Sequence, residues 1–447
     1  MSTQKEIGRR EFLKGSAGGL TLASALAGGA GMLTGCSRAE LSTVTATETV
    51  RKPPDGEKVV IGMIGMGDLG RRHHLNQLLN NPEISTRVEV VAVCDADRNR
   101  RDEAAHMILR KTGRQPRVYE DYRQLVLQPG LDAAVIVTTD HWHALASIAA
   151  MEAGLDVYCE KPLTLTVEEG KAMVRTARRY GTVFQTGSQQ RSDARFRQAC
   201  ELVRNGKIGR IRKIVTVLHP VRKGDWQPNR TPPAGMNWDL WQGQTPYVDY
   251  SPNRVFYEFR WFRMYSGGVM TDWGAHHNDI AQWALGMDQS GPVKVRPVSA
   301  EFAESGMHSV ALDFVVSYTY ANGTELECRT GGKNGVTFYG DKGEIFVSRS
   351  EITASDPDLL KGDTGPIKLY KSDNHHRNWL DCIRTRERCI CDVEIGHRSV
   401  SVCHIGNIAM LLGRELSWDP EKEEFVNDDE ANSMLSRPMR APWHLAG

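Results

Sequence analysis

The sequence has no excess of charge of either sign and, beyond its N-terminus, no long apolar run. Its 56 basic and 55 acidic residues leave a formal net charge of +1, so neither nucleic acid nor an acidic membrane surface is an expected partner. No later apolar segment has the roughly 20 residues needed to cross a bilayer. Internal repeats are also absent. With 447 residues, 40% of them hydrophobic and 25% charged, the composition is typical of a soluble globular protein with two domains.

Residues 1–36 are typical of an export signal. Arg9 and Arg10, followed by Phe-Leu-Lys, resemble a twin-arginine motif, with glycine where Ser or Thr is usual. The stretch 20–33 is uncharged but rich in Gly and Ala, which suits a signal better than a spanning helix. The sequence LTGC resembles a lipobox, and it predicts that Cys36 is lipidated. A plain signal peptide with a chance cysteine is the alternative. We expect a periplasmic or envelope-attached lipoprotein.

Residues 37–57 are rich in Ser, Thr and Pro and have no hydrophobic period. They predict a flexible linker that reaches on the order of 25 Å, so the membrane would be contacted only through the lipid anchor. Eight cysteines follow the linker. Because twin-arginine substrates fold in the reducing cytoplasm before export, we expect thiols rather than a disulfide framework. Cys389 and Cys391 are spaced to share one face of a strand and are expected to be buried.

Residues 58–185 have the pattern of a Rossmann domain. The apolar run KVVIGMI predicts a buried parallel strand, which passes directly into Gly65-x-Gly67-x-x-Gly70 and then into a helical stretch. In such a loop the glycines provide a tight turn, backbone approach to a pyrophosphate, and close packing of helix on strand. The context of strand and helix makes a dinucleotide site the favoured interpretation.

A second strand, 88–95, ends in Asp95, about 25 residues beyond the glycine loop. A carboxylate at this position can accept hydrogen bonds from the ribose hydroxyls of adenosine, and it repels a 2′-phosphate. The next residue is Ala96 rather than a basic residue. The sequence therefore predicts NAD as the cofactor and disfavours NADP.

The alternation of strands and helices continues through the strands 132–140, 156–162 and 183–191 and the helices 142–153 and 167–180. This repetition predicts a doubly wound α/β sheet with ligands at the carboxyl ends of its strands. The residues predicted to bind NAD are Gly65, Met66, Gly67, Asp68, Leu69, Gly70, Asp95, Thr138, Thr139, His141, Glu160, Lys161 and Gln189.

Two further motifs carry a family resemblance. Glu160-Lys161-Pro162 is followed by GGVMTDWGAHHNDIAQWALG at 267–286, and in this order they resemble the glucose–fructose oxidoreductase, inositol dehydrogenase and rhizopine catabolism (Gfo/Idh/MocA) family. The resemblance covers about residues 58 to 420. It implies a C-terminal α/β domain, here 186–425, with a large, mostly antiparallel open sheet that often makes oligomer contacts. We accordingly expect a homodimer or homotetramer, with 426–447 as a C-terminal tail.

The residues themselves also indicate this second domain. From about residue 210 the strand–helix repeat gives way to strands that alternate across turns at Asn322-Gly323 and Asp341-Lys342-Gly343. Two helical stretches follow, near 376–385 and 395–414.

The candidate catalytic residues are Lys161, Asp272 and His276. Asp272 and His276 are four residues apart in a segment of helical period, which places them on one face of a helix. The resemblance implies that this face points at the nicotinamide and that Lys161 approaches it from the other domain. A neutral His276 can accept the proton of a sugar hydroxyl, while Lys161 binds the same oxygen. Asp272 would orient the imidazole or bind a neighbouring hydroxyl.

Several other residues are weaker candidates for substrate contact. They are Arg191, His219, Trp238, Trp241, Trp273 and His277. The tryptophans can stack on sugar faces or pack in the core with equal ease, and His277 should point elsewhere on its helix than its neighbour. The histidine doublets at 73–74 and 375–376 are expected to be solvated. Adjacent side chains diverge, so no metal site is predicted from them.

Export and a dinucleotide cofactor are compatible only if the cofactor stays bound, because no free NAD pool exists outside the cell. Three hypotheses remain open. The first is an exported oxidoreductase of a sugar or glycoside with resident NAD. The second is a glycosidase that oxidises carbon-3 transiently, as exported relatives of this kind do. The third is a non-catalytic carbohydrate sensor, which would not need the proton acceptor.

Overall fold

The computed structural model describes residues 56–221, 226–303 and 308–445. The predicted signal, Cys36, and all but the end of the predicted linker therefore lie outside the described residues. None of the helices within these ranges combines the length and the apolar character that crossing a bilayer requires.

The first domain is built on a six-stranded parallel sheet in the order β3-β2-β1-β4-β5-β6. Its strands are β1 Val59–Ile64, β2 Val88–Cys94, β3 Arg117–Tyr119, β4 Ala133–Ile136, β5 Asp156–Cys159 and β6 Phe184–Thr186. A π-helical segment, Leu69–Leu75, precedes the helices α1 Asn76–Asn80, α2 Pro82–Ser85, α3 Arg98–Thr112, α4 Tyr122–Val126, α5 Asp140–Glu152 and α6 Val167–Tyr180. The order is that of a doubly wound dinucleotide-binding sheet, whose switch point lies between β1 and β4. The predicted Rossmann fold is confirmed.

The second domain holds a nine-stranded sheet in the order β13-β12-β11-β7-β10-β9-β8-β14-β15. Its strands are β7 Ile211–Leu218, β8 Lys294–Phe302, β9 Ala311–Thr319, β10 Glu325–Thr330, β11 Gly335–Gly340, β12 Gly343–Val347, β13 Ile352–Ala354, β14 Leu416–Asp419 and β15 Glu424–Phe425. Its helices are α7 Ala194–Arg204, α8 Trp238–Gln242, α9 Val269–Asp272, α10 Gly274–Leu285, α11 His375–Thr385, α12 Val393–Leu412 and α13 Asp429–Ser433, with short turns of 3₁₀ helix at Gln189–Ser192, Pro252–Arg254, Glu258–Trp261 and Pro357–Leu360.

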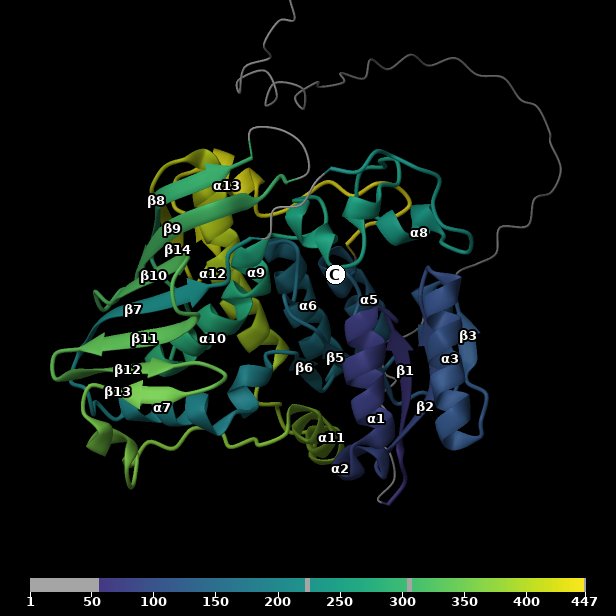
Figure 1. Ribbon diagram of the computed structural model, residues 1–447, viewed down its shortest axis with the longest axis horizontal. Helices are drawn as coiled ribbons and strands as arrows, with labels where there is room; N and C mark the ends of the chain where they lie inside the picture. The colour runs from purple at the N-terminus through teal and green to yellow at the C-terminus, as the bar shows by residue number, and fades with distance from the viewer. Residues whose placement is uncertain (1–55, 222–225, 304–307, 446–447) are drawn as a thin grey trace, which may run out of the picture. The chain divides into compact units, whose positions relative to one another are not determined.

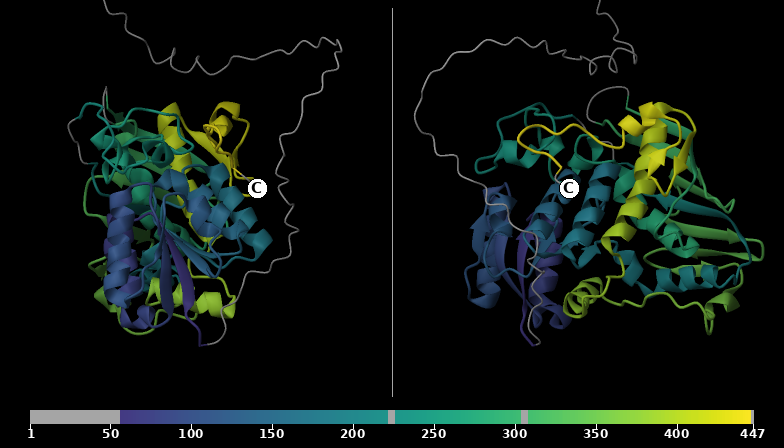
Figure 2. Two further views of the ribbon diagram at one scale, coloured as in Figure 1. Left: turned by 90° about the vertical axis from the view of Figure 1, so that its right-hand side faces the viewer. Right: turned by 180° about the vertical axis from the view of Figure 1, so that it is seen from behind.

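The pairing in this sheet is antiparallel except between β7 and β10. Both predicted hairpin turns are present, between β9 and β10 and between β11 and β12. Helices α10 and α12 lie between the large sheet and the nucleotide domain (Figures 1 and 2). Along β10 buried residues alternate with half-buried ones, as expected when helices cover one face of the sheet only.

The two domains are interleaved in sequence. Helix α11 lies far along the chain, yet Trp379 and Leu380 pack in the same core cluster as Val59 and Ile61 of β1. Figure 1 shows α11 beside α2. The predicted tail also folds back, because Trp443 makes an edge contact with Trp142 of α5 at 4.9 Å between ring centroids.

The prediction of a strand at Cys389 and Cys391 is wrong. These residues lie in the connection between α11 and α12. Both are buried, as expected. All eight cysteines of the described residues are buried free thiols.

Candidate active site

The glycine loop after β1 is shaped for close contact with a ligand. Gly65 has a φ of 91°, and a Cβ there would collide with the backbone of Val137. A Cβ on Gly70 would collide with the carbonyl of Gly65. At Gly67 the nearest atom is Nη1 of Arg100, at 3.1 Å from the position of a Cβ. Gly65 and Gly70 are thus required by the fold itself, whereas Gly67 leaves space for a bound group.

The loop borders a cavity of about 520 Å³ at the carboxyl ends of the parallel strands. This volume is in the range of cofactor sites. The predicted residues that line it are Gly65, Gly67, Asp68, Leu69, Asp95, Thr138, Thr139, Glu160 and Lys161. Oγ1 of Thr138 is buried and has no hydrogen-bond partner, so the cavity holds a polar atom that a bound group would satisfy. These residues fit a dinucleotide.

Four residues predicted to bind the cofactor do not line this cavity: Met66, Gly70, His141 and Gln189. The imidazole of His141 is buried and bonds through Nε2 to the carbonyl of Trp241, at 3.0 Å. The amide of Gln189 donates to Oε1 of Glu160, at 3.3 Å. His141 therefore holds the backbone of Trp241, and Gln189 holds the side chain of Glu160.

Asp95 follows β2, as predicted, and borders the cavity. Its carboxylate accepts hydrogen bonds from the backbone N–H of Met66 at 2.7 Å and of Asp97 at 2.9 Å. Burial raises the pKa of Asp95, while these donors and the nearby Arg100 favour its ionised form. Asp95 therefore also fixes the glycine loop against the end of β2. Its contact with the adenosine ribose stays a prediction.

A segment of the second domain covers this end of the cavity. We call residues 235–261 the cover segment. The backbone N–H of Asn237 donates to the carbonyl of Ala96 at 3.0 Å, and its side chain donates to Glu120 at 3.2 Å. Phe256 lines the cavity, is 59% exposed and has a φ of 58°. The guanidinium of Arg100 lies 4.5 Å from the centre of its ring. A non-glycine residue with this backbone conformation is strained, a feature that clusters at ligand clamps.

Lys161 and Asp272 meet across the two domains. Nζ of Lys161 donates to Oδ1 of Asp272 at 2.6 Å and to its backbone carbonyl at 3.1 Å. Nε of Arg260 lies 3.3 Å from the same Oδ1. Burial by itself would raise the pKa of Asp272, but the Lys161 and Arg260 cations hold it well below its usual range. Asp272 is thus an anchored carboxylate, and the prediction that it orients His276 is wrong.

His276 lies in the first turn of α10, and Trp273 separates that helix from α9. The predicted single helix is therefore two. The imidazole is buried, and its Nδ1 has no hydrogen-bond partner. Burial, followed by the charges of Lys161 and Arg349, lowers the pKa of His276 well below its ordinary value. The ring is consequently neutral, as a proton acceptor must be.

Three of the weaker substrate candidates have structural roles instead. The guanidinium of Arg191 is 1% exposed and makes a bidentate ion pair with Asp279, which is 0% exposed. The indole of Trp238 is buried and donates to the carbonyl of Val248. His277 is buried with Nε2 at 3.2 Å from Oδ1 of Asn334. These side chains are not available to a sugar.

Of the remaining candidates, Trp273 lies beside the predicted base His276, His219 contacts Trp273, and Trp241 borders the cavity. His219 is exposed and makes an edge contact with Trp273, 4.4 Å between centroids. The ring of Trp273 in turn lies 5.7 Å from the ring of His276, measured between centroids. The guanidinium of Arg349 lies 4.7 Å from the centre of the Trp273 ring. Trp241 borders the cavity on the side of the cover segment.

The expectation that the histidine doublets are solvated is wrong. His74, His375 and His376 are buried. Nδ1 of His74 lies 3.0 Å from Nε2 of His376, and its Nε2 lies 3.0 Å from Oε1 of Glu160. The two doublets therefore pack together, and His74 contacts the carboxylate of Glu160 at the edge of the cavity. Among the described residues no cluster of His, Cys, Asp or Glu has the arrangement of a metal site.

Sequence reasoning missed Arg100, Phe256, Arg260 and Arg349. No motif surrounds any of them, and each reaches the site only because a loop or helix of the fold carries it there. The aromatic run FYEFRWF at 256–262 is a weak signal, since charged residues among aromatics often belong to binding surfaces.

Comparison with known proteins agrees with this geometry. Residues 59–188 match the oxidoreductase family's NAD-binding Rossmann fold, and residues 220–445 match its C-terminal alpha/beta domain. The chain is 25% identical over 376 residues to the myo-inositol 2-dehydrogenase of Thermotoga maritima, covering 83% of this chain and 98% of that one. It is 31% identical over 234 residues to a glycosyl hydrolase family 109 protein of Shewanella putrefaciens, covering 49% and 43%.

Solved structures share the fold. The WlbA dehydrogenase of Chromobacterium violaceum, in complex with NADH and UDP-GlcNAcA, has a TM-score of 0.63 at 20% identity, covering 83% of this chain and 99% of that one. The aldose–aldose oxidoreductase of Caulobacter crescentus has a TM-score of 0.61 at 19% identity, covering 81% and 100%. The matched regions include the glycine loop and both motifs that hold the predicted catalytic residues. The chain belongs to the Gfo/Idh/MocA family of NAD-binding oxidoreductases.

Proposed function

We propose that this protein is an exported enzyme that oxidises a ring hydroxyl carbon of a sugar, sugar derivative or glycoside and keeps its NAD bound. The observation that carries the proposal is the Lys161–Asp272 pair, whose lysine lines a cavity that fits a dinucleotide, together with a neutral His276 that is close enough for the charge of Lys161 to lower its pKa. The inositol dehydrogenase among its relatives supports a polyhydroxylated substrate.

Each residue of the site has a separate role in the proposed oxidation. NAD, when bound, supplies the acceptor for the hydride that leaves the carbinol carbon. Asp272 holds the ammonium of Lys161 in place, so that Lys161 can donate a hydrogen bond to the substrate oxygen. His276 takes the hydroxyl proton on its neutral imidazole. Arg260 and Lys161 together keep Asp272 ionised, so the carboxylate that holds Lys161 keeps its charge.

Two features support a resident cofactor. The cover segment binds the edge of the nucleotide domain through Asn237 and places Phe256 over the cavity. If the chain is exported, as its N-terminus predicts, lost NAD could not be replaced. The substrate is expected to be a small molecule. Copies of the chain are expected to pair as a dimer or tetramer through the large sheet.

A glycosidase is the second candidate, and the similarity to a glycosyl hydrolase family 109 protein favours it. A ketone at carbon-3 acidifies the proton on carbon-2. A base removes that proton, the glycosidic oxygen leaves from carbon-1 with its electron pair, and water then adds across the double bond. The hydride that was removed from carbon-3 at the start then returns to it, and with a proton it restores the hydroxyl. A carbohydrate sensor is disfavoured, because it would not need the anchored Lys161 or the neutral His276.

One experiment distinguishes these functions. The full-length protein, purified without added nucleotide, should carry about one dinucleotide for each chain. Turnover of a glycoside panel in heavy water should give no net rise in NADH absorbance. A glycosidase should release sugar with deuterium at carbon-2. A sugar oxidoreductase that regenerates its bound NAD by reducing a second sugar should leave carbon-2 unlabelled and form one oxidised and one reduced sugar. Stoichiometric release of NADH would contradict both resident-cofactor schemes.

The cover segment offers a matched pair of variants for the same experiment. Phe256→Ala removes the ring above Arg100 and should speed the loss of NAD by about tenfold, the effect of one stacking contact. Tyr247→Ala removes an aromatic side chain that is equally exposed but does not line the cavity, and it should retain NAD as the wild type does. Equal retention in both variants would mean that the segment does not hold the cofactor.

Export has a test of its own. Fractionated cells should show the protein in the membrane pellet, attached through the acyl group on Cys36. Cys36→Ala should release it as a soluble species, since the linker alone has no affinity for a bilayer. Wild-type protein found free in the cytoplasm would contradict the signal hypothesis.

A further inference from the structure

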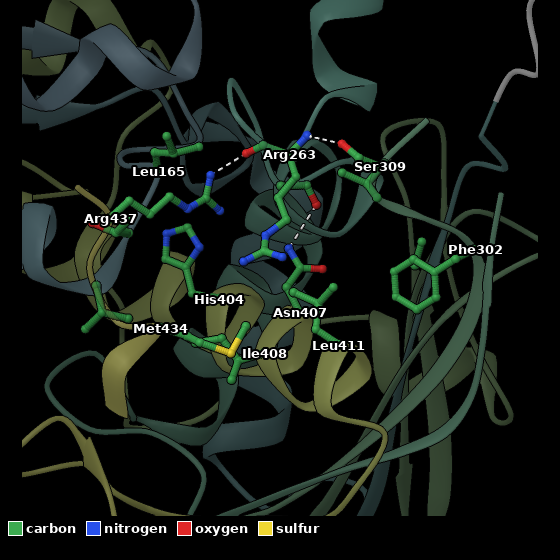
Figure 3. Close-up of a pocket in the computed structure, with 15 residues that line it drawn as sticks. Leu165, Arg263, Phe302, Ser309, His404, Asn407, Ile408, Leu411, Met434 and Arg437 are labelled. Carbon is green, nitrogen blue, oxygen red and sulfur yellow. Dashed lines mark hydrogen bonds between the residues drawn. The ribbon is translucent and has the colours of Figure 1, made fainter. Parts of the chain in front are cut away.

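A second cavity, of about 40 Å³, lies between residues 165–167 at the start of α6 and elements of the second domain, and it shares no lining residue with the nucleotide cavity. Helix α12 contributes His404 and Asn407, and the C-terminal segment contributes Arg437. Arg263, from the loop before α9, enters from the opposite side. Figure 3 shows the two arginine side chains on either side of His404. We call this space the arginine pocket.

The arginine pocket holds two positive charges without an ion-pair partner. The guanidinium of Arg437 donates to the backbone carbonyl of Arg263. No carboxylate of residues 56–221, 226–303 or 308–445 lies within ion-pair distance of either guanidinium. The nearby Glu169 is occupied elsewhere, because its Oε2 accepts from the backbone N–H of Leu165 at 2.8 Å and of Thr166 at 3.1 Å.

The electrostatics of the pocket are unfavourable as they stand. Burial and the neighbouring Arg263 lower the pKa of Arg437 to about 10, although Glu169 opposes them. Burial also lowers the pKa of Arg263. Two like charges in a partly buried space repel each other, and the cost of such an arrangement is normally relieved by a counter-charge.

The other polar groups suit an anion as well. Burial, then the charge of Arg437, lowers the pKa of His404 to about 3, so the imidazole adds no third charge. The hydroxyl of Ser309 accepts from the backbone N–H of Arg263 at 2.7 Å, which leaves its own proton free to donate. A volume of about 40 Å³ accommodates about three water molecules. That is the size of one tetrahedral oxyanion and far less than a sugar ring needs.

We propose that the arginine pocket binds a divalent tetrahedral oxyanion, phosphate or sulfate, either free or as a monoester group. Two guanidinium groups match its two negative charges and provide the forked donors that such oxygens accept. The bound anion joins the C-terminal segment to the start of α6, which follows the Lys161 loop, and to the loop that leads into α9.

The test is thermal unfolding of the full-length protein with its bound cofactor, in phosphate or sulfate and in chloride at equal ionic strength. The unfolding midpoint should rise with phosphate by about 3 °C at a hundred times the dissociation constant and should follow a saturation curve. Arg437→Gln and Arg263→Gln should each weaken phosphate binding by about 10- to 100-fold in calorimetric titration. Lys342→Gln, which removes the same charge from an exposed turn, should leave phosphate affinity unchanged.

A competition experiment identifies the source of the anion, and a conservative variant keeps the proposal testable if a glutamine variant does not fold. Glucose 6-phosphate competing with inorganic phosphate would assign the pocket to a monoester, and its failure to compete would assign it to the free ion. Arg437→Lys keeps the charge and, if the glutamine variant does not fold, should retain weaker but measurable binding. Equal midpoints in phosphate and chloride, or equal phosphate affinity in wild type and Arg437→Gln, would overturn the proposal.

Discussion

Replacing His276 by alanine is expected to slow turnover by about 10²- to 10⁴-fold, the usual cost of losing one general base, while NAD stays bound. The imidazole is buried, neutral and without a hydrogen-bond partner at Nδ1. A residue in this state has no evident packing or ion-pair role that would need a histidine. Single-turnover kinetics of the hydride step, together with the dinucleotide content of the purified variant, measure the effect.

The pH dependence gives a second readout of the same residue. His276 must be neutral to accept a proton, so activity should fall as the pH drops through its pKa. Because that pKa is lowered by burial and by Lys161 and Arg349, the acidic limb of kcat/KM should lie below the ordinary histidine value of about 6.5. His277→Gln is the matched control, since it alters the adjacent buried histidine and can keep the bond to Asn334. Equal losses in both variants would mean that His276 acts only through folding.

Replacing Arg191 by methionine is expected to lower the free energy of unfolding by about 3–5 kcal/mol, because it leaves Asp279 buried without its counter-charge. The guanidinium also donates to Asp288, at 2.7 Å. Urea unfolding measures the loss. Arg195→Gln is the control. It removes a partly exposed partner of Asp193, and such pairs contribute about 0–1 kcal/mol.

The loss in free energy of unfolding that Arg191→Met causes should become smaller as the pH falls. Burial already raises the pKa of Asp279, and Arg191 opposes that rise. Without Arg191 the carboxyl can avoid its uncompensated charge by taking up a proton, so the difference from wild type should shrink as the pH falls. A raised KM for sugar with unchanged stability would restore the substrate role that the sequence suggested for Arg191.

The sequence by itself determined the architecture of the nucleotide domain. A buried parallel strand, three glycines at fixed spacing and an acidic residue at the end of the next strand are local patterns, and each constrains the backbone where it occurs. The predicted helix 167–180 has the same limits as α6, because its capping box and its terminal glycine both lie next to it in sequence. The approach of Lys161 to the face that carries Asp272 and His276 was expected only through the family resemblance, and the ion pair between Lys161 and Asp272 was not expected.

Only the tertiary structure decided which polar residues reach the cavity. Arg191 and His277 looked available to a substrate, but both are buried against partners far along the chain. Arg260 and Phe256 belong to no motif and are signalled only weakly by the aromatic run around them, yet the cover segment brings them to the site. The arginine pocket likewise joins residues from five distant segments. The direction of a side chain and the burial of a charge depend on long-range packing, which neither periodicity nor motif spacing encodes.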